Sequence, residues 1–388
     1  MKTYLVGGAI RDRLLGRTVE ERDFVVVGTT VEELKSQGYV QVGRDFPVFL
    51  HPRTREEYAL ARTERKVAPG YQGFTVYAAP DVTLEQDLER RDLTINALAE
   101  DEDGNLIDPW GGMQDLEKRL LRHVSPAFVE DPVRILRVAR FMARYANLDF
   151  RIADETLALM KAMVVRGEVD ALVPERVWQE LAKALGDGQP SLFFQVLRRC
   201  HALERMFPEL ERLFSIPGDP PYSDTPDTGS GALRALDTAT GLSSSSEVRF
   251  AALTHALDGH SIEKLCERMR APGRFLVLAQ LVAALHNRLP GKERLEAEPL
   301  LELVEKTDAI RRPERFEQFL VSCEAICRVR AVQEPPFDLF RRILNELRGL
   351  NIGALVAGMK DSVEIQRRIR EERLATIDLV IRNVDADN

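Results

Sequence analysis

The opening of the chain, residues 1–28, constrains the fold more than any other stretch. A short apolar run from Thr3 to Val6 ends in Gly7 and Gly8. Helix-forming sequence follows at once, from Ala9 to Leu15, and Gly16 stops it. This order predicts a strand, a glycine turn and the start of a helix. A glycine turn lets a ligand approach the backbone, and the free N–H groups of a first helical turn attract anions.

A second predicted strand, Phe24 to Val27, is preceded by the acidic residues Glu21 and Asp23. In an extended chain residues two apart point to the same face, so the two carboxylates project together. Backbone that binds phosphate, beside carboxylates that bind metal, suits a Mg²⁺-bound nucleoside triphosphate. An ordinary hairpin with solvated acids is the alternative that these residues leave open.

The composition predicts a soluble, globular, cytoplasmic protein. The chain has 388 residues, of which 44% are hydrophobic and 30% charged, so we expect about two to four domains. No long uncharged apolar run and no signal peptide are recognisable, which predicts no membrane association. The four cysteines lack CxxC spacing and are expected to be reduced thiols: Cys200, Cys266, Cys323 and Cys327.

The charge is distributed unevenly. The formal net charge of −8 argues against a surface coated for nucleic-acid binding. From Glu117 to Arg144, however, the chain contains seven Lys and Arg residues but only three acidic ones. A basic strip within an acidic protein predicts a local site for a polyanion.

The hydrophobic pattern changes along the chain and predicts an α+β fold. Residues 1–110 alternate short β-type runs with turn signals, which indicates a small, mostly antiparallel sheet. From about Leu116 onward the period is helical. We therefore predict a head over residues 1–115, a helical neck and body over 116–214, a Pro- and Gly-rich linker over 215–231, and a helical C-terminal domain over 232–388.

Two charged segments lie within the predicted head. The connection from Arg62 to Phe74 contains Pro and Gly and is expected to be a mobile loop near the site. In RRDLTIN, Asp92 and Asn96 would be neighbours on a helix, with Arg90 and Arg91 beside them. This combination suits a triphosphate and a ribose, whereas an ion pair at the start of a helix is the structural alternative.

A third segment, EDPVRILRVAR, places Asp131, Arg134, Arg137 and Arg140 three residues apart. On a helix these side chains form a ridge along one side. A carboxylate accepts from a base amino group and Arg donates to ring acceptors, so Asp131 and Arg134 together could read a base edge. Because Asp131 precedes Pro132, helix capping is the alternative role for this residue.

The two histidines of THALDGH do not have the spacing of a known ligand pair. We expect His255 and His260 to be structural or surface residues.

Taken together, the motifs resemble a known family. LVGGAIRDRLLG, ERDFVVVG, ARTERK, RRDLTINALA, IDPWGG, LLRHVSPAF and EDPVRILRVARF occur in this order. The set resembles the bacterial class II tRNA nucleotidyltransferases, the CCA-adding enzymes, densely up to about residue 215 and weakly beyond. The resemblance implies head, neck, body and tail regions. It also implies Mg²⁺-dependent, template-independent addition of CMP, CMP and AMP from CTP and ATP to the tRNA 3′ end.

The resemblance further implies roles for nine residues. Glu21 and Asp23 match the catalytic metal carboxylates. The implied nucleotide-binding set is Gly8, Arg11, Arg91, Asp131, Arg134, Arg137 and Arg140. Within it, Gly8 and Arg11 would contact the triphosphate, and Asp131 and Arg134 would read the base. The loop between Arg62 and Phe74 resembles the flexible loop that the final A addition needs.

Two departures from the family pattern stand out. The metal motif is usually Asp-x-Asp, and the longer Glu21 side chain moves the first carboxylate, which predicts a reduced rate or a shifted metal preference. Long bacterial members also carry a metal phosphohydrolase domain marked by a His-Asp pair, and here the matching position is His255-Ala256. We therefore expect no phosphatase or phosphodiesterase activity. The C-terminal helices would serve as a scaffold for tRNA contact or self-association, in a monomer or a homodimer.

Three alternatives remain open at this stage. A poly(A) polymerase of the same superfamily is the nearest, although the C-terminal NVDADN is acidic where such enzymes often carry a basic tail. An enzyme that adds only CC or only A is the second. A catalytically inactive RNA-binding relative, marked by Glu21, is the third.

Overall fold

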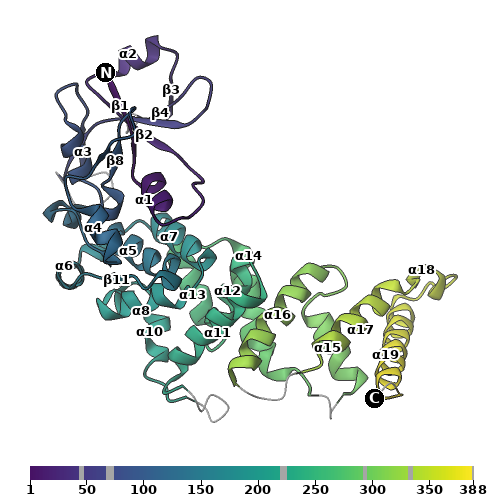
Figure 1. The fold of residues 1–388 in the computed structure, drawn as a ribbon. Helices are drawn as coiled ribbons and strands as arrows, with labels where there is room; N and C mark the ends of the chain where they lie inside the picture. The colour runs from purple at the N-terminus through teal and green to yellow at the C-terminus, as the bar shows by residue number, and fades with distance from the viewer. Residues whose placement is uncertain (43–47, 67–73, 219–224, 292–294, 331–334, 387–388) are drawn as a thin grey trace. The chain divides into compact units, whose positions relative to one another are not determined.

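The structure is a computed structural model that describes residues 1–42, 48–66, 74–218, 225–291, 295–330 and 335–386 (Figure 1). The chain forms two compact units. The first comprises Met1–Gly188 with Leu192–Met206, and the second comprises Gln189–Ser191 with Phe207–Asn388. This division does not test the boundaries predicted after residues 115, 214 and 231, which stay predictions.

The first unit is built on a seven-stranded sheet with the order β3-β4-β5-β2-β1-β8-β9. Neighbouring strands are antiparallel except β2 and β5, which run parallel, so the predicted, mostly antiparallel sheet is confirmed. Its strands are β1 (Lys2–Val6), β2 (Asp23–Val27), β3 (Val40–Val42), β4 (Val48–Leu50), β5 (Glu57–Leu60), β8 (Ala99–Glu100) and β9 (Leu106–Ile107). Two separate pairs are β6 (Thr63–Lys66) with β7 (Phe74–Tyr77), and β10 (Leu120–Leu121) with β11 (Arg151–Ile152).

The central strands bury side chains on both faces of this sheet. Val6 and Val25 pack on one face in a cluster that includes Leu88. Val26 points to the other face, where it packs with Leu34. Because side chains alternate along a strand, the FVVV run supplies both cores from consecutive residues.

The helices up to Met206 are α1 (Gly8–Leu14), α2 (Val31–Ser36), α3 (Leu84–Glu89), α4 (Gly112–Glu117), α5 (Val133–Arg144), α6 (Asp154–Val165), α7 (Pro174–Gly186), α8 (Ser191–Arg199) and α9 (Ala202–Met206). Short 3₁₀ turns cover Thr94–Asn96 and Pro126–Glu130. Helix α5 packs against α7. It buries Ile135, Leu136, Val138 and Ala139, which leaves its arginines for the remaining side.

Beyond Met206 the structure describes only helices as named elements. Besides the short 3₁₀ helix His286–Arg288, they are α10 (Pro208–Leu213), α11 (Thr228–Leu242), α12 (Ser246–Thr254), α13 (Gly259–Met269), α14 (Gly273–Leu285), α15 (Ala297–Lys306), α16 (Pro313–Arg330), α17 (Phe337–Gly349), α18 (Ile352–Leu355) and α19 (Ser362–Ala386). Helix α11 begins inside the predicted linker, of which residues 219–224 lie outside the described part. The four cysteines are buried free thiols. No helix of the described chain has the length and apolar composition to cross a membrane.

Candidate active site

All nine residues singled out from the sequence line one pocket of about 920 Å³ in the first unit. Its wall carries ten Lys and Arg side chains against six acidic ones. Such an excess of cations concentrates anionic ligands. Part of the basic strip therefore lines a pocket where the head sheet meets α5 and α7, and its use as a polyanion site stays a prediction.

The glycine turn after β1 forms one edge of the pocket. Gly7 has a φ of +68°, which disfavours any residue with a Cβ. A Cβ at this position would also lie 2.8 Å from Nη1 of Arg91. Glycine is thus needed here both for the backbone conformation and for the close approach of Arg91, and α1 begins at the next residue, Gly8.

The two predicted metal carboxylates lie on the pocket wall. Asp23 is the first residue of β2, and Glu21 lies in the coil before the strand rather than within it. Burial in the pocket raises the pKa of Asp23, Arg91 opposes this, and the negative charge of Glu21 raises it further. Both carboxylates line the same pocket, two residues apart in the chain. Mg²⁺ is commonly bound by one or two carboxylates together with substrate phosphates, so this pair fits that metal.

Asp92 and Asn96 are neighbours as the sequence predicted, but not on an α-helix. Helix α3 ends at Glu89, and the contact forms across the 3₁₀ turn. Asn96 donates to the Asp92 carboxylate at 2.8 Å, and Arg91 donates to the Asn96 carbonyl at 3.3 Å. Burial alone would raise the pKa of Asp92, but the charge of Arg137 and the hydrogen bonds from Asn96 and Arg137 hold it far below its usual range. Asp92 is thus a permanent anion that anchors Arg137.

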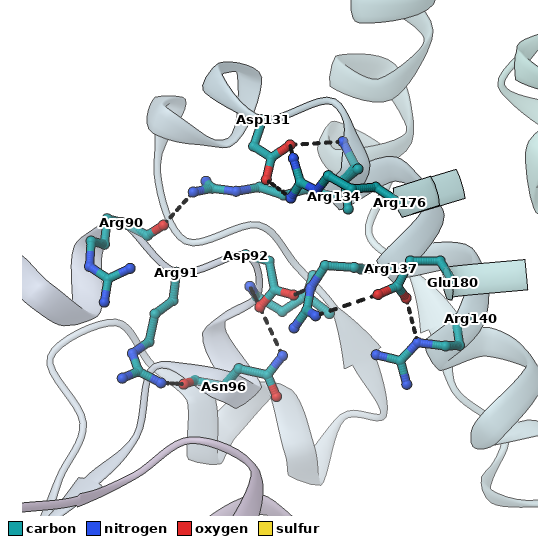
Figure 2. Close-up of polar contacts among 12 residues, drawn as sticks. Arg90, Arg91, Asp92, Asn96, Asp131, Arg134, Arg137, Arg140, Arg176 and Glu180 are labelled. Atoms are coloured by element: carbon teal, nitrogen blue, oxygen red, sulfur yellow. Dashed lines mark hydrogen bonds and ion pairs between the residues drawn. The ribbon is translucent and has the colours of Figure 1, made fainter. Parts of the chain in front are cut away.

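Hydrogen bonds to other parts of the first unit hold the arginine ridge of α5 in place, as Figure 2 shows. Arg134 donates to the backbone carbonyls of Ala127 at 2.9 Å and Arg90 at 2.6 Å. Arg137 donates to Asp92 at 2.6 Å. Arg140 donates to Glu180 on α7 at 2.6 Å. Each guanidinium is held by a different part of the fold, so the ridge is positioned before any ligand binds.

Asp131 makes the capping contact that the sequence offered as an alternative, and its base-reading role stays a prediction. Its Oδ1 accepts the backbone N–H of Val133 at 3.1 Å, which is the capping contact. The same carboxylate accepts two hydrogen bonds from Arg176, at 3.1 and 2.8 Å. The structure thus pairs Asp131 with Arg176, while Arg134, which was predicted to read the base together with Asp131, donates to the Arg90 carbonyl.

Arg11 ties α1 to the far part of α5. Its guanidinium donates to both oxygens of Asp12, at 2.9 and 3.0 Å, and to the Asn96 side chain. It also lies 5.2 Å from the ring centre of Phe141. Asp12 accepts in turn from Arg144 at 3.2 Å. Arg11 therefore lies on the pocket wall beside the last turns of α5.

Helix α7 supplies a second wall that we did not predict. Arg176, Glu180, Lys183 and Asp187 line the pocket or hold the ridge, and their spacing of four, three and four residues puts them on one face. The polar stripe in PERVWQELAKALGD was the available signal, but a solvated helix face has the same pattern.

The two histidines of THALDGH lie as predicted, one in the interior and one at the surface. His255 is 3% exposed, and its Nδ1 lies 2.7 Å from the Ala252 carbonyl. His260 is exposed, next to Glu263. The buried neighbour of His255 is His286, with ring centres 5.2 Å apart. In the described part of the chain, no group of three or more His, Cys, Asp or Glu residues is arranged to hold a metal ion.

Comparisons with known proteins agree with this geometry. The chain matches the family model of the poly(A) polymerase head domain over residues 3–122. It matches the model of a probable RNA- and SrmB-binding site of polymerase A over residues 149–214. Together with the carboxylate pair and the arginine-lined pocket, the head domain defines a nucleotidyltransferase.

Full-length relatives narrow this class. A multifunctional CCA protein of Thioalkalivibrio sulfidiphilus is 59% identical over 84% of this chain and 84% of its own length. One from Nitrosococcus oceani is 52% identical over 97% and 98%. A solved apo form of a CCA-adding enzyme, 22% identical, shares the fold with a TM-score of 0.71 over 100% of this chain and 92% of its own. The chain belongs to the family of multifunctional CCA proteins, and the predicted resemblance is confirmed at this level.

Proposed function

We propose that this chain is a template-independent CCA-adding tRNA nucleotidyltransferase, which transfers CMP, CMP and AMP from CTP and ATP to the tRNA 3′ end and releases pyrophosphate. The observation that carries the proposal is the convergence of Glu21, Asp23 and the α5 ridge on one pocket. Metal ligands, phosphate ligands and a polar edge for a base are then present in the same cavity.

The base is assigned to the end of the pocket where α5 and α7 begin. The Asp131 carboxylate accepts from a base amino group, and an Arg guanidinium donates to ring acceptors. Cytosine and adenine both carry an exocyclic amino group next to a ring acceptor, so one fixed polar edge suits both. Because Arg176 and Val133 fix the Asp131 carboxylate, the protein itself can select the nucleotide without a template.

The phosphates are assigned to the glycine turn and the arginines. Gly8 brings backbone close to the ligand, and Arg11, Arg91, Arg137 and Arg140 surround the same cavity with positive charge. Preorganised cations stabilise the charge that develops as pyrophosphate leaves.

Glu21 and Asp23 are the residues that would hold Mg²⁺. When bound, Mg²⁺ lowers the pKa of the attacking 3′-hydroxyl and neutralises charge on the α-phosphate. The carboxylates must be ionised for this role; burial raises the pKa of Asp23, and the positive charge of Arg91 opposes that rise. No covalent enzyme intermediate is needed.

The test uses tRNA that lacks its CCA end, with Mg²⁺ and labelled CTP alone, ATP alone, or both. We expect two CMP residues with CTP alone and a complete CCA end with both nucleotides. Incorporation of neither nucleotide would refute the proposal. Long A tracts on the acceptor would instead identify a poly(A) polymerase. Addition limited to CC or to A would identify a partial enzyme, and nucleotide binding without turnover an inactive relative.

For the second unit we propose a scaffold without phosphohydrolase activity. Ala256 cannot ligate a metal, and His255 is buried against His286 and the Ala252 carbonyl. The purified protein should not hydrolyse p-nitrophenyl phosphate or bis-p-nitrophenyl phosphate with Mg²⁺, Mn²⁺ or Ni²⁺. Metal-dependent hydrolysis by the wild-type protein would contradict the proposal. If the His255→Gln variant hydrolysed the substrates equally well, the activity would come from a site other than His255. The cytoplasmic location and the monomeric or dimeric state stay predictions.

A further inference from the structure

Helices α5 and α7 run side by side in the same direction, and their side chains meet in the same order. Asp131, just before α5, pairs with Arg176 in the first turn of α7. Arg140 pairs with Glu180 further along. Near the ends of both helices, the charge of Arg144 acts on Asp187. The pocket therefore has a base end, at the start of the helices, and a far end, at their last turns.

Arg11, one of the residues assigned to the phosphates, lies toward the far end. Arg11 packs on the rings of Phe141 and Tyr145, at 5.2 and 5.6 Å from their centres. Its neighbour Asp12 accepts from Arg144 at 3.2 Å and from the Tyr145 hydroxyl at 3.1 Å. A nucleotide whose base lies at Asp131 consequently directs its phosphate chain along α5, toward Arg144 and the end of α7.

Lys183 differs from the other cations along this path. Arg137, Arg140, Arg144 and Arg176 each bind a carboxylate of the fold. Lys183 lines the pocket and is exposed, and across the described ranges no hydrogen bond or ion pair links it to another residue. Within the described residues, its ammonium group is thus not paired with a carboxylate.

We propose that Lys183, supported by Arg144, forms the subsite for the terminal phosphates of the bound nucleotide and holds the pyrophosphate before it leaves. This assignment rests on the proposed function, because the base end defines the direction of the nucleotide. Lysine suits the task, since it is a hydrated point charge on a flexible stem that can follow a departing anion. The volume of about 920 Å³ leaves room for an extended triphosphate beyond the base and ribose.

The experiment measures the binding of CTP, CDP and CMP, with Mg²⁺ and without tRNA, by isothermal titration calorimetry. Lys183→Met should weaken CTP binding roughly 5- to 10-fold and CMP binding less than about 2-fold, because only CTP reaches the subsite. Inhibition of the forward reaction by pyrophosphate should weaken in parallel, and Lys183→Arg should restore most of the loss. The matched control is Lys161→Met, an exposed lysine on α6, which should leave all three affinities unchanged.

Two outcomes would overturn the assignment. Equal weakening of CTP and CMP would show that Lys183 supports the fold of the pocket rather than the terminal phosphates. Unchanged CTP binding with a raised KM for tRNA would show that it contacts the acceptor strand instead. The proposed function is tested separately by CMP incorporation with the wild-type protein. A wild type that binds CTP through Lys183 yet does not extend tRNA would refute the function and leave the subsite standing.

Discussion

Arg176 holds the carboxylate of Asp131 with two hydrogen bonds of 3.1 and 2.8 Å, although 45 residues separate the two in the chain. One oxygen of the same carboxylate also caps the start of α5 through the Val133 N–H. Two elements therefore fix the direction of the remaining acceptor positions. A polar group that reads a base must be held in one orientation, because a rotated carboxylate accepts from a different set of donors.

Arg176→Ala should therefore reduce nucleotide selectivity more than it reduces rate. We expect the ratio of kcat/KM for CTP over UTP to fall by about 10-fold, since a good bidentate contact contributes ~1–3 kcal/mol of discrimination. Misincorporation of UMP into tRNA lacking CCA measures this ratio. Arg205→Ala, which removes an exposed ion pair with Asp170, is the control and should leave it unchanged. If kcat/KM falls equally for CTP and UTP, Asp131 does not take part in nucleotide selection and has only its capping role.

Asp23→Ala should abolish the addition of both CMP and AMP. Asp23 begins β2 within the pocket and is the carboxylate on which Arg91 and Glu21 both act. Loss of a metal ligand removes several kcal/mol of transition-state stabilisation, so we expect a decrease in kcat on the order of 1,000-fold. Primer extension with each nucleotide tests this, and circular dichroism checks that the variant is folded. If the variant still adds CMP or AMP at the wild-type rate, the metal must be held by other residues.

Glu21→Asp tests whether the longer side chain at this position matters. Mg²⁺ demands near-ideal octahedral geometry and tolerates little misplacement of a ligand. If Glu21 places its carboxylate imperfectly, the shorter Asp should raise the ratio of kcat with Mg²⁺ to kcat with Mn²⁺. The coil position of Glu21, outside β2, gives its backbone freedom to compensate instead. An unchanged ratio would show that this compensation is complete.

Local signals in the sequence were sufficient to predict that the glycine turn, the two acidic residues and the arginine ridge are placed as the structure has them, on the lining of one pocket. Each depends on spacing within one segment, as in the three-residue steps from Asp131 to Arg140. The Asp92–Asn96 contact was predicted with the wrong backbone, because a 3₁₀ turn can bring such residues together as a helix does. The role of α7 was missed because Arg176 and Glu180 act on residues 45 and 40 positions away. Such pairings depend on tertiary packing, and the stripe alone resembles a solvated face.

Glu180→Gln should destabilise the first unit. Glu180 is 6% exposed and accepts a hydrogen bond of 2.6 Å from Arg140. It also forms an ion pair with Arg137 at 3.9 Å. Neutralising it leaves a buried guanidinium without its counter-charge, at a cost of ~1.5–3 kcal/mol in the free energy of unfolding. Urea denaturation followed by tryptophan fluorescence measures the change. Glu204→Gln, at an exposed position, should change it by less than about 0.5 kcal/mol. Similar values for both variants would mean that Arg140 finds another partner.

The second unit should lose stability in mild acid. Burial lowers the pKa of His255 to about 3, and His286 and Arg330 contribute in the same direction. The pKa of His286 is also lowered, chiefly by burial. In the unfolded chain both imidazoles would titrate near their ordinary value of about 6.5. Below that pH the unfolded state binds more protons than the folded state, so the free energy of unfolding falls as the pH drops.

Each histidine can contribute a slope of up to about 1.4 kcal/mol per pH unit, beginning near pH 6.5 and continuing toward the folded pKa. Hydrogen-exchange protection factors of α12 and α14, which flank the pair, measure this slope between pH 7.5 and 5. His255→Gln should make the slope shallower, because glutamine stays neutral and its amide can still donate to the Ala252 carbonyl. His260→Gln removes an exposed imidazole and should leave the slope unchanged. If His255→Gln and wild type lose protection equally, acid acts on other groups and the buried pair is not the cause.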